Sequence, residues 1–237
     1  MSTQGHTVKA FDEELDTLRA TIAEMGGLAE AAISEAIDAL VRRDSEAAAR
    51  VVERDARIDA LETEIERSAV QIIALRAPMA DDLREVVAAL KIAGVVERIG
   101  DYAKNIAKRV PSVEDSKIRP LSLLPEMARI AGEMVHNVLD AFAQRDAAKA
   151  IAVRDRDAAV DDFYNSIFRA LLTHMMENPH NITPATHLLF VAKNLERIGD
   201  HATNVAEMVH FSATGSHLGD REKGADTTGI AASDLGE

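Results

Sequence analysis

The chain of 237 residues contains no cysteine and no tryptophan, and it has only 12 glycines and 6 prolines. The absence of cysteine excludes disulfides, thiolate chemistry and cysteine-ligated zinc. No apolar run approaches the roughly 20 residues that a membrane-spanning helix needs, and Met1 to Ala10 lack the apolar core of a signal peptide. These absences predict a soluble, intracellular protein.

Aromatic residues make up 3% of the chain, and β-branched residues do not alternate densely between turn signals. A β-sheet is therefore not expected. Apolar residues make up 47%, mostly alanine, valine, isoleucine and leucine, which are accompanied by many glutamates and arginines. This composition is typical of long helices.

The formal net charge at pH 7 is −13, with 40 acidic and 27 basic side chains. A negative surface repels the phosphate backbone of nucleic acids and the headgroups of anionic lipids. Nucleic-acid binding is therefore disfavoured. Adhesion to anionic lipid is likewise disfavoured, although a local basic patch could still dock onto a protein.

Apolar residues recur at alternating steps of three and four, beginning with Val8, Phe11, Leu15, Leu18, Ile22 and Met25. Such a period predicts helices that each bury one stripe. Asp44 or Ser45 is expected to cap the second helix, and Thr183-Pro184 to begin the last. The predicted helices span residues 8–43, 45–75, 81–108, 122–144, 147–177 and 184–212.

The same plan occurs twice along the chain, which indicates an internal duplication. Residues 97–101 read Glu-Arg-Ile-Gly-Asp, and residues 196–200 repeat these five residues at an offset of 99. Arg43-Asp44 matches Arg145-Asp146 at an offset of 102. The prediction is two pseudo-symmetric three-helix bundles, over residues 8–109 and 121–212. A linker (residues 110–120) joins them, and a disordered tail (residues 213–237) follows.

Four segments place an acidic residue four positions before an aspartate, a spacing that stacks two carboxylates on one helix face. Such like charges repel unless a cation lies between them. Carboxylates from neighbouring helices suit hard cations such as Mg²⁺, Mn²⁺, Ca²⁺ or ferric iron. The candidate metal ligands are the four pairs Asp55 and Asp59, Glu97 and Asp101, Asp157 and Asp161, and Glu196 and Asp200.

The helical period places these acids on surfaces or in grooves rather than in the core. Glu97, Asp101 and Asn105 lie roughly opposite the apolar seam of their helix, and Asp55 and Asp59 flank the stripe of theirs. The clusters could form within one half or between the halves. The alternative is that all these acids are solvated surface charges, with Arg98 and Arg197 as ion-pair partners.

Other candidate ligands lack a repeated counterpart. Glu133 and His136 have the Glu-x-x-His spacing that di-iron bundles use on two helices, but it occurs once. His201 corresponds to Tyr102 in the first half, so it is not expected to be a shared ligand. No phosphate-binding glycine loop and no nucleophile elbow is present, and nothing pairs a nucleophile with a base.

The duplicated Glu-Arg-Ile-Gly-Asp motif, with residues 78–84 (Pro-Met-Ala-Asp-Asp-Leu-Arg) before its first copy, resembles the PhoU family of phosphate-transport regulators. The likeness covers roughly residues 8–212. The second half has Thr183-Pro184-Ala185-Thr186 in place of the Asp-Leu-Arg element, so any role of Asp82 and Arg84 is confined to the first.

This resemblance implies a cytoplasmic protein, often a homodimer, that negatively regulates phosphate uptake and phosphate-starvation signalling and has no enzymatic activity. The implied partners are the ATPase subunit of the phosphate ABC transporter and a phosphate-responsive sensor histidine kinase. Association with membranes would then be peripheral, through such complexes only. Family members bind metal clusters through acid-x-x-x-Asp motifs, and iron, manganese, magnesium or zinc are the candidate ions here. The competing hypothesis is a ferritin-like oxidoreductase or iron store, which needs two Glu-x-x-His segments where this chain has one.

Overall fold

The computed structural model describes residues 3–114, 116, 118 and 122–219, and their side chains from residue 11 onward. The side chain of Val8 in the predicted seam and residues 220–237 of the predicted tail lie outside this description. Within the described part there are six long helices and no strand, which confirms the all-α prediction. The elements are α1 (Thr3–Arg42), α2 (Ser45–Arg76), α3 (Asp81–Ala107), α4 (Val110–Val113), α5 (Leu123–Gln144), α6 (Ala147–Glu177), the 3₁₀ turn η1 (Pro179–Asn181) and α7 (Ile182–Thr214).

The predicted apolar seams are buried. On α1, Leu15, Leu18, Ile22 and Met25 lie in the core, while Phe11 packs at its margin. The six residues of the third predicted seam are fully buried: Ile92, Val96, Ile99, Ala103 and Ile106 on α3, and Val110 at the start of α4. Each removes its apolar surface from water, which stabilises the fold by about 25 cal/mol per Å².

The two halves turn in the same way between their first and second helices. Arg43 and Arg145 both adopt positive φ, at 58° and 54°. The following aspartates cap the next helices, because Asp44 accepts from the Ala47 amide at 2.8 Å and Asp146 from the Lys149 amide at 2.9 Å. The prediction of a cap at Asp44 is confirmed.

The predicted start of the last helix is wrong. The last helix begins at Ile182, so Thr183-Pro184 lies inside its first turn, where a missing proline N–H costs no helical hydrogen bond. The turn η1 leads directly into it, and Asn178 accepts from the His180 amide to begin that turn. The linker begins with the short helix α4, which buries Val110 and Val113.

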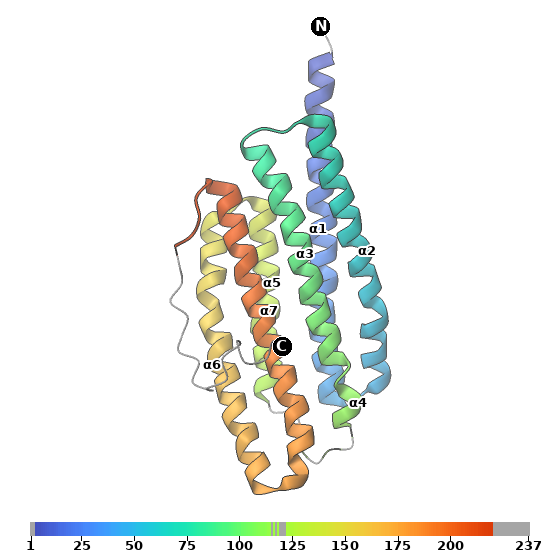
Figure 1. The fold of residues 1–237 in the computed structure, drawn as a ribbon, viewed down its shortest axis with the longest axis vertical. Helices are drawn as coiled ribbons and strands as arrows, with labels where there is room; N and C mark the ends of the chain where they lie inside the picture. The colour runs from blue at the N-terminus through green and yellow to red at the C-terminus, as the bar shows by residue number, and fades with distance from the viewer. Residues whose placement is uncertain (1–2, 115, 117, 119–121, 220–237) are drawn as a thin grey trace, which may run out of the picture.

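The two three-helix units pack side by side around one continuous core (Figure 1). Contact between them runs through α3 against α7 and α1 against α5. The turn from α2 to α3 lies at one end of the molecule, and the equivalent turn from α6 to α7 lies at the other. No helix in the described part is long and apolar enough to cross a membrane.

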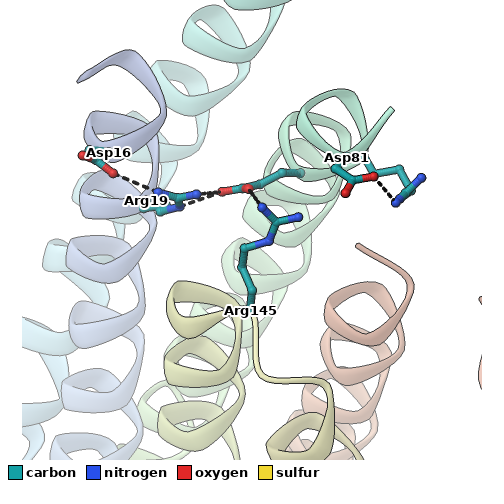
Figure 2. Close-up of polar contacts among 6 residues, drawn as sticks. Asp16, Arg19, Asp81 and Arg145 are labelled. Carbon is teal, nitrogen blue, oxygen red and sulfur yellow. Dashed lines mark hydrogen bonds and ion pairs between the residues drawn. The ribbon is translucent and has the colours of Figure 1, made fainter. Parts of the chain in front are cut away.

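A buried carboxylate joins the two units at one end of the bundle (Figure 2). Glu85 on α3, with a side chain 3% exposed, accepts from Arg19 Nε on α1 at 2.6 Å. Its other oxygen lies 3.4 Å from Nη1 of Arg145, at the end of α5. An uncompensated charge here would cost several kcal/mol, so the two arginines together hold Glu85 in place.

Arg84, from the Asp-Leu-Arg element, also spans the two units. Its guanidinium is paired with Asp81, and a Cβ built on Gly215 at the end of α7 would lie 3.5 Å from the Arg84 Cζ. Gly215 has a φ of 73°, which favours glycine. The element confined to the first half therefore contacts the last helix of the second.

Candidate functional site

The repeated Glu-Arg-Ile-Gly-Asp motif lies within α3 and α7, and in each copy its glycine lies against the preceding helix. A Cβ built on Gly100 would lie 2.9 Å from Ile58 Cδ1 and 3.5 Å from Asp55 Oδ1 on α2. A Cβ on Gly199 would lie 2.7 Å from Asp157 Oδ1 on α6. Both glycines thus admit a close approach that a larger residue would block, and this brings an aspartate of the neighbouring helix against the motif.

Asp55 and Asp157 are therefore buried, with 7% and 2% of their surfaces exposed. The prediction that all the candidate acids are surface or groove groups is wrong for these two. The motif helix covers the flank on which they lie because its glycine lets it come close. Of the other candidates, Asp59 is exposed. The remaining five are partly buried: Glu97, Asp101, Asp161, Glu196 and Asp200.

In the first repeat the chain itself supplies a cation to this site. Lys104 Nζ donates to both Asp55 Oδ2 and Asp101 Oδ1. Burial lowers the pKa of Lys104, but the hydrogen bonds to Asp101 and Asp55 outweigh burial and raise it above its ordinary value. The ammonium is thus charged and neutralises a buried aspartate. The sequence did contain a signal for this role of Lys104, because Lys104 follows Asp101 by three residues and this spacing places both side chains on one helix face.

Glu62 on α2 is a further member of this acidic cluster that the acid-x-x-x-Asp spacing did not include. Burial, followed by the charges of Asp101, Glu62 and Asp59, raises the pKa of Glu97 to about 7. The pKa of Glu62 is raised by burial and by Glu66 and Asp59. Glu62 follows Asp59 by three residues, and this spacing on one helix face was the sequence signal that could have identified it. The cluster forms between α2 and α3 of one repeat.

The second repeat keeps the aspartates but has its lysine at a different position in the sequence. At the offset of 99, Thr203 corresponds to Lys104, and Lys193 corresponds to Gly94. The Lys193 ammonium lies 2.8 Å from Glu196 Oε1 and 5.1 Å from the centroid of the Tyr164 ring, the counterpart of Glu62. The two repeats thus offer different electrostatic surroundings to equivalent acids.

The donor chemistry of both clusters fits a hard cation, but their arrangement does not form a ready-made centre. Among the described residues, no three His, Asp or Glu side chains are placed so that they could hold a metal ion. In the first repeat Lys104 already contacts two of the candidate ligands. Metal binding therefore stays a prediction, and it requires side chains to move.

The single Glu-x-x-His segment does not converge on one point. His136 Nδ1 lies 3.2 Å from Glu30 Oε2 on α1 and belongs to the contact between α1 and α5. Glu133 is paired instead with Arg129 on its own helix. The segment therefore contributes surface ion pairs.

His201 and its counterpart Tyr102 meet where α3 and α7 pack together. Their rings are stacked with centroids 5.3 Å apart, and the Tyr102 hydroxyl lies 3.2 Å from His201 Nε2. Contact between equivalent residues indicates that the pseudo-twofold axis passes through this pair. His201 is thus part of the contact between the repeats.

Comparison with known proteins accounts for this duplicated architecture. The PhoU domain matches the chain twice, over residues 22–110 and 124–209. The chain belongs to the PhoU family. The phosphate-specific transport system accessory protein PhoU homolog of Zymomonas mobilis is 57% identical over 223 residues, which cover 94% of each chain. The homolog of Caulobacter vibrioides is 52% identical over 217 residues, covering 90% of this chain and 94% of the relative.

Solved structures of the family share the fold. PhoU from Pseudomonas aeruginosa superposes with a TM-score of 0.83 at 36% identity, covering 87% of this chain and all (100%) of that one. The phosphate transport system regulatory protein PhoU from Streptococcus pneumoniae also gives 0.83, at 28% identity, covering 88% of this chain and 99% of that one. These matches confirm the predicted family and fold.

The raised pKa of Glu97 predicts a pH-dependent effect on stability. The Glu97 carboxyl binds its proton more tightly in the folded protein than in the unfolded chain. The stabilisation that comes from protonating Glu97 is therefore complete below the ordinary pKa of 4.5, and it is lost as pH rises to about 7. Glu97→Gln, which resembles the protonated form, should raise the free energy of unfolding at pH 8 by on the order of 1 kcal/mol, allowing for solvent screening. It should change nothing at pH 4.

Urea denaturation at the two pH values provides the measurement. Glu53→Gln, on an exposed part of α2, is the control and should leave stability unchanged at both. Equal stability of Glu97→Gln and the wild type at pH 8 would contradict the proposed repulsion.

Proposed function

We propose that this protein restrains phosphate uptake and phosphate-starvation signalling through protein contacts in the cytoplasm. The observation that carries the proposal is the match along most of the chain to proteins named accessory proteins of the phosphate-specific transport system, at up to 57% identity. A solved relative of the same fold is named a regulatory protein of phosphate transport. The proposed partners are the ATPase subunit of the phosphate ABC transporter and a phosphate-responsive sensor histidine kinase, engaged by a homodimer.

The structure supports a binding role rather than catalysis. Where the first repeat gathers acids, a lysine contacts two of them, and the single Glu-x-x-His segment divides between separate ion pairs. An iron oxidoreductase of the ferritin type needs two such segments facing one another. No observation in the described part favours that alternative over the regulatory function.

A chromosomal deletion tests the regulatory function. In phosphate-rich medium, the deletion strain should keep phosphate uptake and starvation-induced genes active, because the proposed restraint is gone. Uptake of radiolabelled phosphate and a reporter fused to a starvation promoter provide the measurements, and a plasmid copy should restore repression. Wild-type repression in the deletion strain would contradict the proposed function.

As a secondary part of the proposal, a divalent cation binds the carboxylates of the second repeat. The support is the oxygen-donor chemistry of these acids, which recur at the spacing of the first repeat, where Lys104 already contacts Asp55 and Asp101. Asp157, Asp161 and Asp200 would then provide hard oxygen ligands. The bound cation would stabilise the second repeat.

Titration with Mn²⁺ tests this site. At a hundred times the dissociation constant, bound metal stabilises the folded protein by about 2.7 kcal/mol. This corresponds to roughly 5–10 °C in melting temperature for a domain of this size. Glu196→Gln/Asp200→Asn should abolish the shift, and the matched Glu97→Gln/Asp101→Asn variant should keep it. Identical shifts in all three proteins would show that these acids bind no metal.

A further inference from the structure

Among the described residues, those along the line where α3 and α7 meet include cations and aromatic rings but no carboxylate. Because Tyr102 and His201 are in contact, their helical neighbours line the same surface. We call it the seam surface. It consists of Lys91, Arg98, Tyr102 and Asn105 on α3, Arg109 between α3 and α4, and Phe190, Arg197, His201 and Asn204 on α7.

The two arginines of the repeated motif flank the centre of the seam surface. The Arg197 guanidinium lies 6.0 Å from the centroid of the Tyr102 ring. Burial, and then the charges of Arg98 and Arg197, lower the pKa of His201, although the charge of Asp200 opposes them. The His201 imidazole is therefore neutral at pH 7. Both arginines are exposed.

The seam surface also has the composition of a protein-binding surface. At one end Phe190 is 48% exposed, and the Arg109 guanidinium lies 4.7 Å from the centroid of its ring. Lys91, two turns before Arg98, is exposed towards the other end. Arginine and aromatic side chains are enriched where proteins bind one another. Four cations without a carboxylate, in a chain with a net charge of −13, mark this strip as distinct from its surroundings.

Acidic side chains bound this strip on both sides, which limits the shape of its ligand. Glu97 and Asp101 face α2 on one side, while Glu196 on α7 pairs with Lys193 beside α6 on the other. A broad polyanion such as nucleic acid or an anionic membrane would overlap these acids and be repelled. A helix, about 10–12 Å in diameter, would fit between them.

We propose that the seam surface binds an acidic amphipathic helix of a partner protein. From Lys91 to Arg109, at about 1.5 Å per residue, the strip is about 27 Å long, which matches a helix of roughly 18 residues. Glutamates or aspartates of that helix pair with the four cations, and its apolar residues pack on Phe190 and Tyr102. The flanking acids repel a helix that lies out of register. This inference rests on the proposed function, since it assigns the surface through which a partner is engaged.

Charge reversal at the two motif arginines tests the proposal, and the chain offers a matched control. Arg67 and Arg169 are likewise exposed and equivalent in the two repeats, but they lie on α2 and α6. The probe is a fluorescein-labelled 18-residue amphipathic peptide with glutamate and leucine along one face, and binding is followed by anisotropy. Arg98→Glu/Arg197→Glu should weaken binding at least tenfold, and Arg67→Glu/Arg169→Glu less than twofold. Circular dichroism should show both variants folded.

The same variants, expressed in the deletion strain, separate this proposal from the function on which it rests. If wild type and control restore repression and the seam variant does not, both ideas stand. If all three restore it, the regulatory function stands and the seam proposal is wrong. If the wild type itself has no effect, the proposed function fails.

Four further outcomes would overturn the assignment of the ligand. One is failure of the peptide to bind the wild type. Another is a change in molar mass by light scattering in the seam variant, which would make the surface a contact between copies of this chain. The last two are binding of phosphatidylglycerol vesicles, or of inorganic phosphate, that the same substitutions abolish.

Discussion

The close approach of each motif helix to the helix before it is the contact on which the site depends. At Gly100 and Gly199 no Cβ intervenes, so α3 lies directly on Ile58 of α2, and α7 on Asp157 of α6. This approach buries one aspartate in each repeat, against the ordinary preference of carboxylates for water. The same helices α3 and α7 then contact each other through Tyr102 and His201. The motif therefore shapes both its own repeat and the contact between repeats.

Burial of equivalent aspartates makes the difference between the repeats chemically important. In the first repeat Lys104 supplies a positive charge to Asp55 and Asp101, which leaves Glu97 and Glu62 to share the remaining repulsion. In the second repeat the lysine lies beside Glu196 and Tyr164 instead. A duplicated fold has thus retained its backbone contacts while its two acidic clusters have different electrostatic properties.

The helices and the duplication were predictable because both depend on local spacing. The periods that placed Ile92 and Val96 in the core, and the aspartate that caps α2, are properties of one helix or one turn. The burial of Asp55 was not predictable in the same way, since it depends on a glycine 45 residues further along the chain. Lys104 was overlooked because its role requires Asp55 on another helix. Stacking of Tyr102 on His201 likewise follows only from how the repeats pack.

The stability of alanine variants at the four relevant glycines tests the central contact most directly. Gly199→Ala and Gly100→Ala should each lower the free energy of unfolding in urea by about 1–3 kcal/mol, because the new methyl group overpacks the helix contact. Gly27→Ala and Gly132→Ala, where a Cβ would meet nothing within 4 Å, should raise it by up to about 1 kcal/mol through helix propensity. If alanine at Gly100 and Gly199 also stabilises the protein, the helices do not depend on this approach and the account is wrong.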